Sequence, residues 1–261
     1  MSNASSDPGK SEPQPQQVPW NPWWGVLFVV IAYYASQIIA SVLILVYALS
    51  KHWSHAQAAN WLGNSVNAQF AYILAAEAFA IGAIYLFLRF YKADLASIGL
   101  KRPRWLDPLY GLSAVPVYLI LYILSVGLVS HFVSGFNINQ QQQLGFTDVH
   151  GTVQLTLTFI SLVVLPPLAE EIMVRGFLYS SLKKAMPTAG AVIVTSAIFA
   201  SAHLPEGGAA GPLYIAALDT FVLSLVLIYL REKTGSLWAS ITLHAVKNGV
   251  AFMTLFVLHP R

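Results

Sequence analysis

Seven long apolar stretches dominate this chain and restrict it to folds that cross a lipid bilayer. They lie at about residues 22–49, 66–88, 109–134, 153–182, 187–204, 212–230 and 235–258. As helices, they are long enough to span a hydrocarbon core of about 30 Å. A transmembrane β-barrel would show short segments of alternating apolar and polar residues instead. We therefore predict an all-α protein, a polytopic bundle of transmembrane helices.

The fourth stretch is long and contains the pair Pro166-Pro167. Proline removes a backbone hydrogen-bond donor and clashes with the preceding helical turn, so this helix should bend or break. A break would divide the stretch into two shorter helices. The sequence therefore predicts seven membrane-spanning helices and leaves eight open.

The composition agrees with a membrane protein and excludes several other classes. The chain is 56% hydrophobic and 10% charged, whereas a soluble domain carries about 25% charged residues. The net charge of +3 does not indicate nucleic-acid binding, because the basic residues lie in short loops between apolar stretches. The absence of cysteine excludes disulfides, a thiol nucleophile and a thiolate metal site.

The charges of the loops predict the orientation of the bundle. Most basic residues fall on one side of it, namely Lys10, Arg89, Lys92, Lys101, Arg102, Arg104, Lys183, Lys184, Arg231 and Lys233. The other side has only Lys51 and Arg261. The positive-inside rule therefore places the N-terminus in the cytoplasm. Residues 1–20 are rich in Ser, Pro, Gln and Asn and lack the pattern of a signal peptide, so we predict a disordered tail.

Ionisable residues at membrane depth cost about 2.5 kcal/mol or more, so each is a functional candidate. Glu170 and Glu171 are adjacent and point about 100° apart on a helix. Glu171 and Arg175 are spaced i,i+4 and can form an ion pair. Glu170 then has no obvious local partner, which suits a general base. A purely structural charge network is the alternative.

Two further polar groups follow on later helices. His203 ends the fifth stretch, and His244 and Asn248 are spaced i,i+4 on the seventh. Taken alone, each could be a helix cap or an interhelical hydrogen bond. However, at 1.5 Å per residue, Glu170, His203 and His244 lie about 21, 24 and 16 Å from the predicted cytoplasmic helix ends. The three groups should therefore meet at similar depth.

Three other charged residues lie in apolar stretches. Glu77 and Asp219 either line a chamber or pack against Ser, Tyr or backbone groups. Lys247 precedes Asn248, and we expect it to point away from the site or to snorkel.

At these residues the sequence resembles the CAAX protease and bacteriocin-processing (CPBP, or Abi) family of intramembrane proteases, which includes the type II CAAX prenyl endopeptidase. The family pattern is E-E-x-x-x-R, F-x-x-x-H and H-x-x-x-N on successive membrane helices. Here it is met by Glu170, Glu171 and Arg175, by Phe199 and His203, and by His244 and Asn248. The resemblance covers about residues 150–258, and the first 150 residues match only in being membrane helices. We therefore predict a disordered tail (1–20), accessory transmembrane helices (21–150) and a catalytic transmembrane domain (151–261).

The resemblance implies hydrolysis of a peptide bond inside a membrane-embedded chamber. Glu170 would activate a water with the help of His203, and His244 and Asn248 would stabilise the oxyanion. Glu171 and Arg175 would hold the site or grip the substrate. The expected partners are the lipid bilayer and a peptide or protein substrate, lipidated in the CAAX-like case, and no nucleic acid.

The need for a metal stays open at this stage. Glu170, His203 and His244 form a two-His, one-carboxylate set that would suit catalytic zinc with one open position. The same residues can work without a metal, and the metal-free mechanism is our preferred expectation. The enzyme is thus either glutamate-dependent or a metalloprotease.

Other classes fit the sequence less well. The zincin pattern H-E-x-x-H, a G-x-S-x-G serine motif and paired membrane aspartates are missing. A transporter would also bury Glu, His and Arg, but inverted repeats are not evident. A non-catalytic protein of the bacteriocin-immunity type is the other alternative. We expect an integral protein of the prokaryotic inner (cytoplasmic) membrane.

Overall fold

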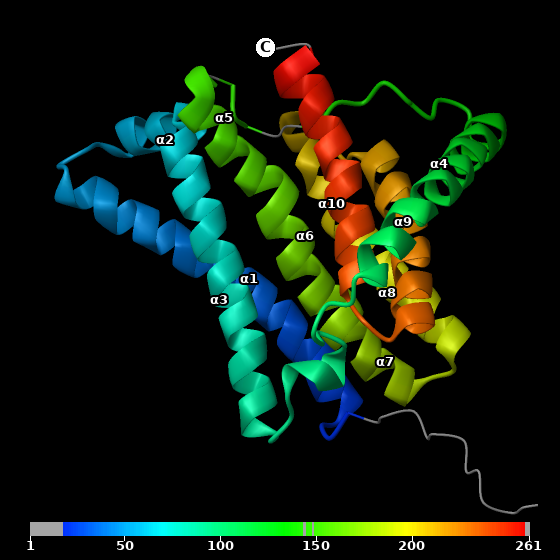
Figure 1. Ribbon diagram of the computed structural model, residues 1–261. Coiled ribbons are helices and arrows are strands. Elements are labelled where there is room, and N and C mark those ends of the chain that lie inside the picture. The colour runs from blue at the N-terminus through cyan, green and yellow to red at the C-terminus, as the bar shows by residue number, and fades with distance from the viewer. Residues whose placement is uncertain (1–17, 143–144, 148, 259–261) are drawn as a thin grey trace, which may run out of the picture.

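The computed structural model describes residues 18–142, 145–147 and 149–258. Within these residues, seven helical segments are long and apolar enough to cross a membrane (Figure 1). Six of them are built on α1 (Pro22–Ser50), α3 (Val66–Phe90), α4 (Leu106–Phe132), α8 (Thr188–Ala202), α9 (Tyr214–Thr234) and α10 (Trp238–Phe252). The part of the chain that is described contains helices and no strand, which confirms the all-α transmembrane bundle.

The fourth span is one helix, Gly151–Ala185, that changes its winding twice. It consists of α5 (Gly151–Phe159), η2 (Ile160–Val164), α6 (Leu165–Glu170), η3 (Glu171–Leu178) and α7 (Tyr179–Ala185). The segments η2 and η3 are π-helical. The Pro166-Pro167 pair lies in the first turn of α6, where a missing backbone N–H is tolerated. The wider π-helical turn η2 lies before the prolines, and the helix continues through them without a break. The fourth stretch is therefore one span, and the alternative of eight spans is wrong.

Four short helices complete the described structure. They are α2 (His55–Asn64), η1 (Leu95–Ile98), η4 (Leu204–Ala210) and η5 (Met253–Leu258). A capping box between Ser54 and Gln57 starts α2. The π-helical η5 prolongs α10, and η4 directly follows α8.

The fourth span lies between two groups of helices (Figure 1). On one side α1 packs against α3, and α3 contacts α5 and α6. On the other side α4 packs against both α9 and α10, α8 packs against α9, and α10 contacts η2 and α6. The π-helical segments of the fourth span therefore lie where both groups meet, and its residue Glu171 is fully buried.

The residues just before α1 are anchored to the C-terminal part of the bundle. Trp20 is fully buried and stacks on Phe177, with ring centroids 5.0 Å apart. Its indole N–H donates to Ser181 Oγ at 2.9 Å. Lys184 Nζ donates to the carbonyls of Val18 and Trp20 at 2.9 and 2.8 Å.

These contacts correct the predicted end of the N-terminal tail. The sequence assigned residues 1–20 to it, but Val18 and Trp20 are part of the core. Gly25 permits this close packing, because a Cβ there would lie 2.3 Å from Ser181 Oγ. The remainder of the tail, residues 1–17, lies outside the described residues. The division of the transmembrane part into accessory and catalytic domains stays a prediction.

Candidate active site

A cavity of about 490 Å³ lies inside the bundle, and the four residues predicted to be catalytic all line it. Glu170 comes from the end of α6, His203 from the end of α8, and His244 and Asn248 from α10. The predicted meeting of the three polar groups thus occurs around one space. Their catalytic roles stay proposals.

Glu171 links two of the sequence motifs. Its Oε1 accepts a hydrogen bond from Arg175 Nη1 at 3.0 Å and another from His244 Nδ1 at 2.9 Å. The side chains of Glu171 and Arg175 are fully buried, and His244 is only 5% exposed. Because a carboxylate can only accept, the Nδ1 of His244 carries a proton and its Nε2 points elsewhere.

Phe199 joins the remaining motif to this network. The guanidinium of Arg175 lies over its ring, 4.1 Å from the centroid, in cation–π geometry. The rings of His203 and His244 meet Phe199 edge-on at 4.7 and 6.2 Å. Two guanidinium nitrogens, Nε and Nη2, have no hydrogen-bond partner among the described residues. The ring of Phe199 is therefore the main contact of the flat face of the Arg175 guanidinium.

His203 is held by the backbone of its own helix end. Its main-chain N–H bonds to Ala200 O at 3.1 Å, a tighter turn than in an α-helix. This leaves the carbonyl of Phe199 for the ring, whose Nδ1 donates to it at 2.8 Å. The Nε2 then faces Glu206 Oε1 at 3.8 Å. Glu206 also accepts from Gln142 Nε2 at 2.8 Å, and both residues line the cavity.

Asn248 is positioned by the proline pair on the fourth span. Its Nδ2 donates to Leu162 O at 2.9 Å. In an α-helix this carbonyl would pair with the N–H of residue 166, and in a π-helix with that of residue 167. Both positions are proline and have no N–H. Pro166 and Pro167 therefore leave an acceptor that the side chain of Asn248 takes.

Glu170 has one carboxylate oxygen without a hydrogen-bond partner. This oxygen, Oε2, is buried, lies 3.7 Å from His244 Nε2 and has no partner within the described part of the chain. The side chain is 23% exposed and lines the cavity. Glu171 and Arg175, by contrast, do not line it. The two adjacent glutamates thus face different surroundings, as their helical spacing predicts.

The structure also places the three charged residues that the sequence left outside the motifs. Glu77 and Asp219 line the cavity, which was one of the two options for them. Lys247 lines it too and pairs with Asp219, Nζ to Oδ2 at 3.0 Å. The expectation that Lys247 points away or snorkels was therefore wrong. The ion pair with Asp219 holds it towards the cavity.

Two residues near the site were not among the predicted site residues. Tyr118 of α4 does not line the cavity itself, but donates its hydroxyl hydrogen to Asp219 Oδ1 in a short hydrogen bond. Glu206 of η4 lines the cavity. No spacing links either residue to the motifs, so the sequence could not assign them to the site.

The donor set for zinc does not converge in this arrangement. Across residues 18–142, 145–147 and 149–258, no group of three His, Asp or Glu side chains is placed to hold a metal ion. Glu170 and His244 approach each other, while His203 Nε2 faces Glu206.

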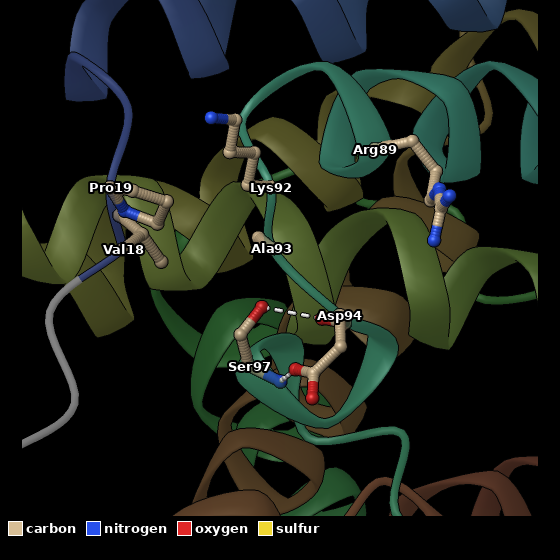
Figure 2. Close-up of a pocket in the computed structure, with 7 residues that line it drawn as sticks. All are labelled: Val18, Pro19, Arg89, Lys92, Ala93, Asp94 and Ser97. Atoms are coloured by element: carbon tan, nitrogen blue, oxygen red, sulfur yellow. Dashed lines mark hydrogen bonds between the residues drawn. The ribbon is translucent and has the colours of Figure 1, made fainter.

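A second cavity, of about 580 Å³, is larger but holds none of the predicted site residues. It lies beside the end of α3, and its lining includes Arg89, Lys92 and Asp94 (Figure 2). Arg89 and Lys92 extend away from each other in this view. Asp94 is used to cap η1, because Ser97 N donates to its Oδ1 at 2.9 Å. We therefore assign the candidate site to the smaller, internal cavity.

Fold and site together define a polytopic membrane protein with a buried carboxylate–histidine centre. Residues 152–250, from α5 to α10, match the model of the family described as type II CAAX prenyl endopeptidase Rce1-like. The match covers all three motifs and supports an assignment to the CPBP family of CAAX proteases. It supports a hydrolase of the CAAX intramembrane protease type. No curated protein and no solved structure gave a significant match.

Proposed function

We propose that this protein is an intramembrane endopeptidase that cleaves a membrane-associated or lipidated, CAAX-like peptide with water activated by Glu170. The observation that carries the proposal is the carboxylate of Glu170, whose partly exposed side chain lines the cavity beside His244 and whose Oε2 has no hydrogen-bond partner among the described residues. His203 and Asn248 line the same space. A general base needs this combination of access to water and fixed neighbours.

The proposed reaction begins with a water held between Glu170 and His203. Glu170 takes a proton from it, and the oxygen forms a bond to the carbonyl carbon of the scissile peptide. His203 donates through Nδ1 to a backbone carbonyl, so its Nε2 is an acceptor that can orient the same water. When the tetrahedral intermediate collapses, the C–N bond breaks. Glu170 then returns the proton to the leaving amine.

His244 and Asn248 are proposed to bind the oxyanion of that intermediate. Asn248 uses one N–H on Leu162 O, and the second N–H of the amide is available. His244 has its Nδ1–H engaged by Glu171, so Nε2 can donate only when the ring carries both protons. Glu170 and Glu171 on either side provide the counter-charges for that form. Fixed donors of this kind stabilise charge that develops during the reaction.

Glu171 and Arg175 are proposed to hold the site rather than to grip the substrate. Their side chains have no exposed surface and do not line the cavity. Apolar residues of the cavity lining, including Ile73, Leu255 and Phe256, provide a surface for a hydrocarbon chain. The preferred mechanism needs no cofactor. We further propose a prokaryotic cytoplasmic membrane, with the N-terminus in the cytoplasm.

The first test compares the protein and peptide termini of membranes that contain the wild-type chain or Glu170→Ala. New termini that appear only with the wild type would support proteolysis and assign Glu170 to it. Glu232→Gln is a matched control, because this carboxylate pairs with Lys183 outside the cavity and should leave cleavage unchanged. Identical termini from wild type and Glu170→Ala, at equal amounts of inserted protein, would contradict the proposal.

A further inference from the structure

The cavity wall contains a single basic side chain among the described residues that line it, Lys247. The other charged groups of the wall are acidic, namely Glu77, Glu170, Glu206 and Asp219. Apart from the oxyanion donors proposed above, Lys247 is the group of this wall that would attract a negatively charged part of a ligand.

The ammonium of Lys247 is held in place but not saturated. Asp219 Oδ2 binds Lys247 Nζ at 3.0 Å, and the other oxygen of Asp219 accepts from Tyr118. Lys247 has no second hydrogen-bond partner within the described part of the chain. An ammonium has three N–H donors, so further donors remain for a ligand. The side chain is 26% exposed, and its exposed part faces the cavity.

The pair of Lys247 and Asp219 differs from the buried ion pair of Glu171 and Arg175. Glu171 and Arg175 form theirs with both side chains fully buried and away from the cavity. Lys247 and Asp219 form theirs on the cavity wall, with 26% and 15% of the side chains exposed. A pair that served packing alone would gain nothing from this access. The support from Tyr118 and Asp219 fixes the position at which Lys247 presents its charge.

Lys247 lies close to the groups proposed to act on the scissile bond. It follows His244 by three residues on α10, about 4.5 Å along the helix axis, and directly precedes Asn248. An extended peptide advances about 3.3 Å per residue. A group bound by Lys247 would therefore lie within about two or three residues of the scissile bond.

We propose that Lys247 is a specificity-determining residue that binds a carboxylate of the peptide substrate and so sets which bond is presented to Glu170. This inference rests on the proposed function. The carboxylate can come from an acidic side chain or from the end of the peptide, since both present the same acceptor oxygens. The acidic remainder of the wall disfavours other positions for it, which fixes the register of the peptide.

Binding can be measured without cleavage by using the full chain with Glu170→Gln in detergent. The probes are fluorescent peptides of one sequence with an S-farnesyl cysteine. One ends in a free carboxylate, the second in an amide, and the third in an amide with an added Asp within three residues of the cysteine. Fluorescence anisotropy gives the Kd of each peptide for three proteins. They are Glu170→Gln alone, Glu170→Gln with Lys247→Arg, and Glu170→Gln with Lys247→Met. Lys233→Met, an exposed lysine of α9, is the control.

We expect the acid or the Asp peptide to bind at least about tenfold tighter than the neutral amide, as for one charge-assisted hydrogen bond. The preferred peptide identifies the source of the carboxylate. Lys247→Arg and Lys233→Met should keep the preference, and Lys247→Met should abolish it. Because Lys247→Met leaves the carboxylate of Asp219 without its counter-charge, Lys247→Met with Asp219→Asn repeats the test without an unpaired charge.

The inference is overturned if the three peptides bind equally, if none binds, or if the preference survives in Lys247→Met. Cleavage by the wild-type chain is measured separately on the same peptides. Carboxylate preference without any cleavage would refute the endopeptidase and leave the carboxylate site standing. Cleavage without the preference would refute the site and leave the endopeptidase standing.

Discussion

His244 Nδ1 lies 2.9 Å from Glu171 Oε1, and this contact ties the last helix of the bundle to the fourth span. The same oxygen accepts from Arg175. A buried carboxylate that orients a histidine in this way sets which ring nitrogen faces the reaction. The contact therefore combines two effects, one on stability through Arg175 and one on chemistry through His244.

Glu171→Leu should lower both stability and activity. The change leaves the guanidinium of Arg175 buried without its counter-charge, which costs about 3–5 kcal/mol. It also removes the acceptor of His244, and loss of an orienting carboxylate lowers kcat by roughly 10²- to 10⁴-fold. Unfolding in detergent and peptide cleavage measure the two effects.

The double variant Glu171→Leu with Arg175→Leu separates these effects. Replacing a whole buried pair by apolar residues is often neutral for stability, so unfolding should return close to wild type. Activity should not recover, because His244 still lacks its acceptor. Recovery of both would mean that Glu171 acts on the fold alone.

Pro166→Ala should lower activity while leaving the fold at least as stable. The new N–H can bond to the carbonyl of Leu162, which Asn248 now occupies. Loss of one oxyanion donor typically costs about 10²- to 10³-fold in kcat, and Asn248→Ala should show that full loss. Pro166→Ala should show part of it, with an unchanged KM.

Pro116→Ala is the matched control for this prediction. Pro116 lies inside α4 and does not line the cavity. The substitution adds a backbone N–H to a transmembrane helix without touching Asn248, so activity should stay at the wild-type level. Equal losses from both proline substitutions would assign the effect to helix geometry instead of to Leu162 O.

Much of this architecture follows from one-dimensional information. The apolar stretches predict seven spans because hydrocarbon leaves a backbone few options besides a helix. The i,i+4 pairing of Glu171 with Arg175 is local and is seen in the structure. The fate of Pro166-Pro167 was harder to predict, since a π-helical turn competes with a break.

Contacts between distant helices lie beyond such reasoning. Spacing paired Glu171 with Arg175, but it could not show that His244 shares the same oxygen. Likewise, Lys247 was expected to point outward because nothing in the sequence marked Asp219 as its partner. The direction of the Lys247 side chain depends on how α9 and α10 pack against each other. The sequence pattern does not give the rotation of one helix relative to the other.

Removal of metal tests the preferred mechanism directly. We expect cleavage by the purified protein to persist after dialysis against a strong zinc chelator, since Glu170 and its histidine neighbours can carry out the reaction by acid–base chemistry. A known zinc protease, treated in parallel, should lose activity. Loss of activity that zinc alone restores would establish the metalloprotease alternative for Glu170, His203 and His244.

Trp20→Ala should destabilise the whole bundle although Trp20 precedes the first span. The indole is fully buried, stacks on Phe177 and donates to Ser181, so its removal leaves a cavity that costs about 3–5 kcal/mol. Trp23 is 60% exposed, and Trp23→Ala should change stability by no more than about 0.5 kcal/mol. Unfolding of both variants in detergent gives the comparison. Equal effects would mean that Trp20 serves only as an interfacial anchor and that its packing against Phe177 adds no stability.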